Sequence, residues 1–125
     1  MKTPLVLAVD DEPNILKLLK TNLLAEGYEV ITACSGTEAL HLVEENELAL
    51  ILLDINMPGI DGFQTAQTIR KDSDVPIIML TARDDITSLE KALCIGADDF
   101  LTKPFSVREL SARVKAKIRR SVRGT

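Results

Sequence analysis

Short apolar runs alternate along the chain with longer stretches whose apolar residues recur at helical spacing. Five runs have the length and composition of strands, and each is followed by a stretch of helical pattern. The strands are predicted at residues 5–9, 28–32, 49–53, 76–80 and 99–102. Most of these runs are nearly continuously apolar, as strands buried on both faces are. Regular alternation of strand and helix predicts a parallel sheet covered by helices on both faces.

Helix boundaries are marked by residues with known preferences for helix ends. Pro13 suits a first helical turn, where its missing N–H costs nothing, and Gly27 suits a helix end. Ser35 and Ser106 are each followed three residues later by Glu, which predicts capping boxes, and Asp61 can cap a further helix. The predicted apolar helix faces consist of Ile15, Leu18, Leu19 and Leu23; Phe63, Ala66 and Ile69; Ile86, Leu89 and Leu93; and Val107, Leu110, Val114 and Ile118.

The five strand–helix units define a fold class. Right-handed crossovers leave few topologies, and the flavodoxin-like strand order 2-1-3-4-5 is a common one. We therefore predict an α/β fold with a five-stranded parallel sheet in the order 2-1-3-4-5 and helices on both faces. The length of 125 residues fits one domain. We expect this domain to span residues 1–121, with residues 122–125 forming a tail or the start of a linker.

Composition and charge narrow the classes of function. Hydrophobic residues make up 46% of the chain, charged residues 27%, and the net charge is −4. Such a chain lacks the basic face that phosphate contacts require, so we expect no direct nucleic-acid binding. No apolar run approaches the ~20 residues that cross a bilayer, and the apolar start is too short for a signal peptide. We expect no membrane association and a cytoplasmic location.

Two residue types that often carry chemistry, cysteine and histidine, have plain interpretations here. Cys34 and Cys94 form neither a disulfide framework nor a CxxC motif, and we expect both to be reduced thiols buried in the core. His41 lies on a predicted helix as the single histidine of the chain, and we assign it no role.

Polar side chains instead gather at the carboxyl ends of the predicted strands, where open α/β sheets place their functional sites. Asp10 and Asp11 follow the first strand and Asp54 follows the third. These strands are neighbours in the predicted order, so the three carboxylates should converge. Like charges at ~4 Å repel by roughly 4 kcal/mol at an effective dielectric constant of 20. Either a raised pKa or a bound divalent cation such as Mg²⁺ must compensate.

Two further side chains belong to the same edge of the sheet. Thr81 ends the fourth strand and Lys103 follows the fifth, so a hydroxyl and an ammonium could hold an anion beside the cation. Taken singly, Thr81 is an ordinary strand-end residue, Lys103 an ordinary solvated lysine, and Asp10–Asp11 an ordinary turn and helix cap. Asp54 differs because an acid in the most apolar run of the chain needs a buried partner.

Four motifs resemble the response-regulator receiver domain of two-component signalling. They are VDDEPN at 9–14, LLDINMPGIDG at 52–62, IMLTA at 78–82 and GADDFLTKPF at 96–105. The resemblance implies that Asp54 is the phosphoacceptor and that Asp10, Asp11, Asp54 and the Asn56 carbonyl bind Mg²⁺, with Mn²⁺ as an alternative. It also implies that Thr81 and Lys103 bind the phosphoryl group.

The same resemblance implies a partner and a switch. A histidine kinase would donate the phosphoryl group, and Thr81 would then move inward and let Phe100 rotate, changing the surface of the fourth helix, fifth strand and fifth helix. Asn56 and Arg83 flank the site and are expected to tune hydrolysis of the acyl phosphate. The Lys103–Pro104 peptide is similar to one that is cis in the family.

The C-terminal half also resembles transcription regulators of the OmpR type. In that subfamily, residues at five positions would pair two receivers symmetrically on phosphorylation. These positions are Asp98, Asp99, Glu109, Arg113 and Arg120. A solvated charged face is the alternative, since exposed ion pairs contribute little. Ser88-Leu89 and Cys94 depart from the charged residues usual at those positions, which weakens the dimer hypothesis. The chain is either a lone receiver or a fragment, and in a longer protein a DNA-binding or other output domain would follow.

Two other functions are weighed against a receiver. A Mg²⁺-dependent phosphohydrolase with an aspartate nucleophile would place a second acid two residues after it, where this chain has Asn56. A flavin-binding flavodoxin relative needs a phosphate-binding loop after the first strand, where Asp10 and Asp11 would repel the phosphate. We therefore expect a phosphorylated signalling switch and not an enzyme acting on a separate substrate.

Overall fold

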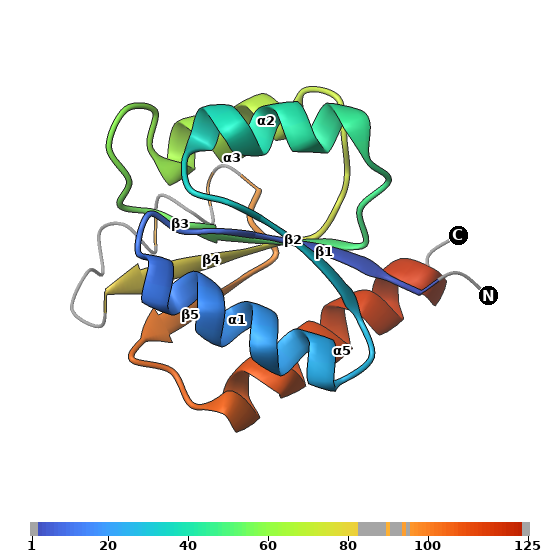
Figure 1. The fold of residues 1–125 in the computed structure, drawn as a ribbon. Helices are drawn as coiled ribbons and strands as arrows, with labels where there is room; N and C mark the ends of the chain where they lie inside the picture. Colours follow the sequence, from blue (N-terminus) through green and yellow to red (C-terminus); the bar gives the residue numbers. More distant parts are fainter. Residues whose placement is uncertain (1–2, 83–89, 91–93, 95, 124–125) are drawn as a thin grey trace.

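The chain forms a five-stranded parallel sheet with helices on both faces (Figure 1). The structure is a computed structural model that describes residues 3–82, 90, 94 and 96–123, without the side chains of 82 and 120–123. The strands are β1 (Leu5–Val9), β2 (Glu29–Ala33), β3 (Leu50–Asp54), β4 (Ile77–Ala82) and β5 (Asp99–Lys103). Their order is β2-β1-β3-β4-β5, which confirms the predicted topology.

Four helices are defined within the described part of the chain. They are α1 (Pro13–Ala25), α2 (Gly36–Glu45), α3 (Gly62–Arg70) and α5 (Val107–Arg123). Helices α2 and α3 cover one face of the sheet, and α1 and α5 cover the other (Figure 1). The predicted helix face of Ile86, Leu89 and Leu93 lies outside the described residues. Helix α5 runs to Arg123, so the first part of the predicted tail at 122–125 continues the helix.

The core consists of two aliphatic layers, one on each face of the sheet. Successive strand residues alternate between the layers, as the pleat of a strand requires. The layer under α2 and α3 contains Leu7, Val9, Ile51, Leu53 and Met79. The layer under α1 and α5 contains Val6, Ala8, Leu50, Leu52, Ile78 and Leu80. Strand β3 is buried along its whole length, which confirms that it is central.

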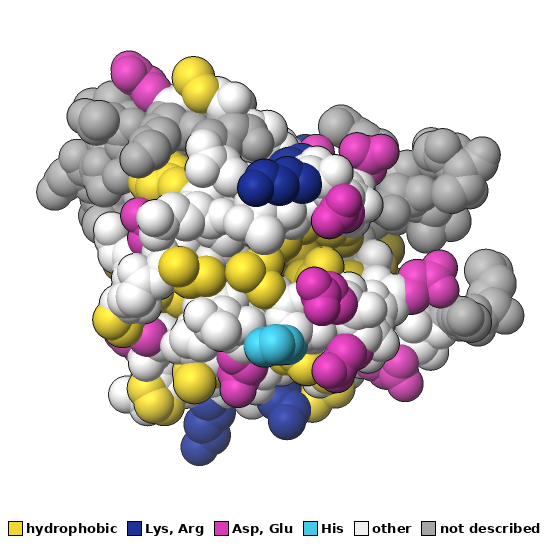
Figure 2. All heavy atoms as spheres, turned by 90° about the horizontal axis from the view of Figure 1, so that it is seen from above, with side chains coloured by type: hydrophobic (Ala, Val, Ile, Leu, Met, Phe, Trp, Pro, Cys, Tyr) yellow, Lys and Arg dark blue, Asp and Glu magenta, His cyan; other side chains and the backbone are white. Residues whose placement is uncertain are grey.

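Acidic side chains lie on the face formed by α2 and α3 (Figure 2), and those within the helices belong to α2, because α3 contains no Asp or Glu. No lysine or arginine occurs between residues 21 and 69. The exposed acids of α2 are Glu38, Glu44 and Glu45, and His41 is exposed on the same helix. Hydrophobic atoms show between the two helices in this view, where the helices pack against each other and against the sheet.

Side-chain caps begin three of the helices. Asp61 forms a complete capping box with Gln64 at the start of α3. Ser35 Oγ accepts the Glu38 N–H at 3.1 Å, but the Glu38 carboxylate accepts the N–H of Cys34 and not that of Ser35. At α5, Ser106 Oγ accepts the Glu109 N–H at 3.0 Å. The predicted cap residues are therefore correct, although the second bond of the α2 box goes to the neighbouring residue.

Four predicted burials are wrong. Both cysteines are free, but both are exposed: Cys34 directly follows the edge strand β2, and Cys94 is exposed as well. Leu18 is 38% exposed because it stands one helical step, about 100°, from the buried Leu19. Val107 is 49% exposed at the first position of α5, whereas Leu110, Val114 and Ile118 further along the helix are buried as predicted.

Candidate functional site

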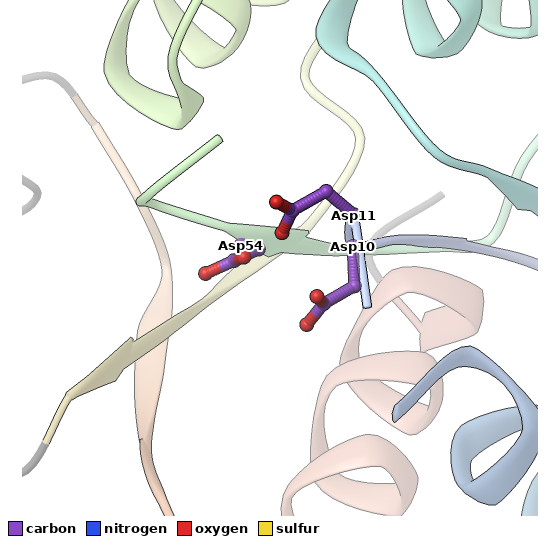
Figure 3. A group of neighbouring side chains, drawn as sticks. All are labelled: Asp10, Asp11 and Asp54. Carbon is purple, nitrogen blue, oxygen red and sulfur yellow. The ribbon is translucent and has the colours of Figure 1, made fainter. Parts of the chain in front are cut away.

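Three carboxylates converge at the carboxyl edge of the sheet (Figure 3). Asp10 and Asp11 follow β1, and Asp54 is the last residue of β3, which pairs with β1. One carboxylate oxygen from each of the three lies within 4.8 Å of the others. Asp10 and Asp54 are buried and Asp11 is exposed, so the cluster opens to solvent on one side. The predicted convergence is confirmed.

Backbone hydrogen bonds hold the two buried carboxylates in place. Asp10 N donates to the Ala33 carbonyl at 3.2 Å, and Asp10 Oδ1 accepts the Glu12 N–H at 2.9 Å. Asp54 Oδ1 accepts the Asn56 N–H at 3.3 Å. These bonds fix the Asp10 backbone at the end of β1 and orient the Asp10 and Asp54 carboxylates.

Lys103 comes from the edge strand β5 and bridges the two buried acids, Asp10 and Asp54. It ends β5, and its side chain reaches past β4 so that Nζ lies 2.8 Å from Asp10 Oδ2 and 3.5 Å from Asp54 Oδ1. The exposed Glu12 lies 3.9 Å from the same ammonium. The Lys103–Pro104 peptide is cis, as the resemblance implies. Glu12 was not predicted, although it directly follows the two site aspartates.

Among the residues that the structure describes, the site carries more negative than positive charge. Burial raises the pKa of Asp54, and the Asp10 and Asp11 charges raise it further, while Lys103 and the Asn56 N–H lower it; the balance is a pKa of about 7. Burial alone lowers the pKa of Lys103, but the hydrogen bond to Asp10 and the charges of Asp54 and Glu12 raise it overall. A single ammonium therefore does not neutralise three carboxylates. Hard oxygen donors with an excess of negative charge suit Mg²⁺.

Thr81, Phe100 and Asn56 lie close to the cluster in sequence or register. Thr81 is fully buried on β4, one residue beyond Leu80, which pairs with Asp54. Phe100 is half-buried on β5 and packs against the core layer under α2 and α3. Asn56 is exposed two residues after Asp54. Arg83 lies outside the described residues.

The charges proposed for a dimer face are paired within the chain. Asp98 binds Arg70 at 2.7 Å and also accepts the Ile77 N–H at 2.8 Å. Both carboxylate oxygens of Asp99 lie 2.9 Å from Arg113 Nη1. Arg113 further lies 3.6 Å from Glu109. The side chain of Arg120 is outside the described part of the structure. The sequence contained no signal for Arg70, which also donates to the carbonyls of Gly96, Ser73 and Val75.

Comparison with known proteins assigns the family. The profile of the response regulator receiver domain matches residues 6–115. The chain belongs to this family. The receiver domain is 51% identical over 115 residues to the "Probable transcriptional regulator ycf27" of Cyanidium caldarium, covering 92% of this chain and 46% of that protein. It therefore spans about half the length of the curated relatives it matches.

Solved receiver structures are similar throughout the fold. A Francisella response regulator receiver is 37% identical with a TM-score of 0.89, covering 95% of this chain and 99% of that one. The chemotaxis protein CheY4 of Vibrio cholerae is 33% identical with a TM-score of 0.87, covering 92% and 98%. These likenesses do not favour the phosphohydrolase or flavodoxin alternatives. Among the described residues, no helix of this receiver domain is long and apolar enough to span a membrane.

Proposed function

We propose that Asp54 of this receiver domain accepts a phosphoryl group from a phosphohistidine on a partner histidine kinase, with Mg²⁺ required. The observation that carries this proposal is the cluster itself: a buried Asp54 whose carboxylate lies beside two other acids and a single ammonium. A carboxylate nucleophile that forms an acyl phosphate needs such a positioned group and a source of positive charge.

Asp10, Asp11, Asp54 and the Asn56 carbonyl would hold the cation. The donor set of carboxylate and carbonyl oxygens fits Mg²⁺, and Mn²⁺ accepts similar ligands. When bound, Mg²⁺ supplies positive charge that offsets the developing charge on the phosphoryl oxygens. The exposed side of the cluster at Asp11 leaves space for water ligands and for the incoming phosphoryl group.

The residues of the chain have separate tasks in the transfer. An ionised Asp54 oxygen attacks phosphorus in line, the P–N bond of the phosphohistidine breaks, and the imidazole nitrogen keeps the bonding electron pair. Lys103, whose ammonium lies 3.5 Å from Asp54, would contact a phosphoryl oxygen by a short movement. The Thr81 hydroxyl would donate a hydrogen bond to a second phosphoryl oxygen. Later attack of water on the acyl phosphate releases inorganic phosphate, and Asn56 and Arg83 would tune that rate.

The negative charge added to Asp54 by phosphorylation would change the protein surface near Phe100 on β5. The phosphate adds a charge of about −1.5 to −2 beside Asp54. Thr81 would be drawn toward it, and the half-buried Phe100 on the neighbouring strand would rotate inward. Support for this switch comes from the register, which sets Thr81 beside Thr102 and Phe100 beside Met79.

A homodimer through the fifth strand and helix is a further proposal. Asp99 and Arg113 bring opposite charges to one surface, which supports it. Because both are already paired within one chain, a dimer would exchange intrachain for interchain pairs, and each exchange would contribute little by itself. Apolar contacts would have to supply most of the affinity.

The output of the switch is a separate proposal, because the chain spans about half the length of its curated relatives. We propose a cytoplasmic transcription regulator in which a DNA-binding or other output domain reads the switched surface. The description of the relative from Cyanidium caldarium as a transcriptional regulator supports this proposal.

Peptide mapping after treatment with a small phosphodonor and Mg²⁺ tests the assignment to Asp54. Borohydride reduces an aspartyl phosphate to homoserine, which marks the residue permanently. Trypsin then separates residues 21–70, which contain Asp54, from the peptide with Asp10 and Asp11, because no lysine or arginine lies between 21 and 69. The mark is expected at Asp54, and a mark at any other carboxylate would contradict the proposal.

A further inference from the structure

The segment that follows Asp54 leaves the sheet and returns to its starting point. Ile55 N donates to the Leu80 carbonyl at 3.0 Å, which fixes the segment to β4 at its start. Gly62 N donates to the Ile55 carbonyl at 2.9 Å, which closes the segment at its end. Asn56, whose carbonyl is a proposed cation ligand, lies within this closed loop. The loop geometry therefore depends on how closely its two ends meet.

Gly62 makes that close approach possible. It is the first residue of α3, and a Cβ at this position would lie 2.3 Å from the Asp54 carbonyl oxygen and 2.7 Å from Ile55 Cα. Distances below 3.0 Å essentially never occur for a real Cβ, and the atoms it would meet belong to the backbone. They cannot rotate away as a side chain can. Any side chain at position 62 must therefore push the start of α3 and the Asp54 backbone apart.

The geometry points to Gly62 as a positioning residue for Asp54 and for the Asn56 carbonyl. Its missing side chain lets the first turn of α3 pack directly on the Asp54 peptide, which sets the loop from Asp54 to Gly62 in the shape needed to gather the cation ligands. This inference rests on the proposed function of Asp54. Its consequence is that a single methyl group at position 62 weakens cation binding and phosphoryl transfer through the backbone, without touching a reacting atom.

Gly36 provides a matched control within the same molecule. It is also buried and is also the first residue of a helix, α2. A Cβ at Gly36 would lie 2.3 Å from Thr65 Oγ1 and 2.7 Å from Ile60 Cγ1, which is equally close. The atoms met here are side-chain atoms and not backbone, although Ile60 belongs to the same loop as Asn56. Gly36→Ala therefore adds the same methyl group at the same helical position against side chains, which can rotate, whereas Gly62→Ala meets the Asp54 backbone.

The experiment compares wild-type protein, Gly62→Ala and Gly36→Ala. Calorimetric titration gives the Mg²⁺ affinity, intact mass gives the rate of labelling by a small phosphodonor, and urea unfolding gives stability. Gly62→Ala is expected to weaken Mg²⁺ binding about tenfold or more, as loss of a residue that orients metal ligands does. Gly36→Ala should stay within about twofold of wild type at temperatures where it is folded. Equal affinities for Gly62→Ala and wild type, or equal losses in both variants, would overturn the inference.

A second pair of variants keeps the test decisive if Gly62→Ala does not fold. Asp61→Ala removes the cap that holds the first turn of α3, whereas Asp61→Asn removes the same charge and keeps a good cap. Weaker Mg²⁺ binding by Asp61→Ala than by Asp61→Asn is the expected result. Equal affinities of the two would show that the start of α3 does not position the site.

Failure of this inference is distinguishable from failure of the proposed function. If Asp54 is not the phosphoacceptor, Asp54→Asn remains labelled, and the Mg²⁺ titrations still report on Gly62. If Asp54 is the phosphoacceptor but Gly62 has no positioning role, labelling disappears in Asp54→Asn and persists at the wild-type rate in Gly62→Ala.

Discussion

The Lys103 ammonium lies 2.8 Å from Asp10 Oδ2 and 3.5 Å from Asp54 Oδ1, where it bridges the two buried acids of the cluster. Asp10 is fully buried and Lys103 is only one-fifth exposed, so water screens this pair weakly. Without a bound metal, this ammonium supplies part of the positive charge that would otherwise come from a divalent cation. It must also be available for the phosphoryl group, so Lys103 connects the stability of the resting state to the proposed transfer.

Removal of this ammonium should therefore destabilise the metal-free protein. Lys103→Met leaves Asp10 buried without its cation, which we expect to lower the free energy of unfolding by about 3 kcal/mol. Mg²⁺ should restore most of the loss because it supplies the missing charge, and labelling of Asp54 should slow strongly. Urea unfolding in chelator and in Mg²⁺ measures the first effect. Lys115→Met is the control, since its exposed pair with Glu26 at 3.4 Å contributes less than about 1 kcal/mol. Equal losses in both variants would contradict the bridging role of Lys103.

The raised pKa of Asp54 predicts how stability depends on pH without metal. Its pKa is about 7 in the folded protein against 3.8 ordinarily, so between these values the folded state keeps a proton that the unfolded state has released. Stability from this group is present below pH 3.8 and is lost as pH rises toward 7. A shift of this size corresponds to at most about 4 kcal/mol.

Urea unfolding of wild type and Asp54→Asn at several pH values isolates this contribution. The variant carries no carboxylate at position 54, so the difference in unfolding free energy between the two proteins should change in favour of the variant as pH rises from 4 to 7. Saturating Mg²⁺ should reduce the change by stabilising the ionised carboxylate. A pH-independent difference in chelator would contradict the shifted pKa.

A substitution of the exposed Asp11 should change Mg²⁺ affinity but not the free energy of unfolding. Asp11→Asn should weaken Mg²⁺ binding about tenfold or more, because a charge within ~4 Å of the cation contributes more than 1.4 kcal/mol even at an effective dielectric constant of 20. Stability should change by less than about 0.5 kcal/mol, since the side chain lies at the surface. Glu45→Gln, at the end of α2 and the opposite edge of the sheet, removes an equal charge and should bind Mg²⁺ as wild type does. Calorimetric titration compares all three, and an unchanged affinity for Asp11→Asn would exclude Asp11 as a ligand.

The dimer proposal predicts a change of mass in solution on activation. With beryllofluoride as a phosphoryl mimic, sedimentation at high micromolar concentration should show a dimer, and Arg113→Ala should weaken it. Arg113 pairs with Asp99 within one chain, and its removal would also remove the interchain pair that the dimer would form in exchange. A wild-type protein that binds the mimic and stays monomeric at these concentrations would refute the dimer.

The sheet order and the convergence of Asp10, Asp11 and Asp54 could be predicted because both follow from local pattern. Strand length, apolar runs and cap residues define the order of elements, and the order brings strand ends together. Burial of single side chains was less predictable. Leu18 and Leu19 are equal in hydrophobicity, yet a rotation of one residue around α1 exposes the first. Cys34 is exposed because β2 is an edge strand, which composition does not reveal.

Contacts between distant residues were the least predictable. Arg70 is an ordinary helix-end residue in the sequence, and only the fold brings it to Asp98 across 28 positions. Likewise, Asp99 and Arg113 pair within one chain, whereas their charges alone are compatible with a pair between two chains. The role proposed for Gly62 is likewise hidden in the sequence, since it depends on how closely the start of α3 approaches the Asp54 backbone.

Intact-mass measurement after incubation with a small phosphodonor tests the role of Asp54 most directly. Wild-type protein in Mg²⁺ should gain the mass of one phosphate, and chelator should prevent the gain. Asp54→Asn should gain none, whereas Asp72→Asn, which alters an exposed acid after α3, should label as wild type does. The predicted result is a single phosphate that requires both Mg²⁺ and Asp54; labelling that persists in Asp54→Asn, or a wild-type protein that never gains a phosphate, would contradict the assignment.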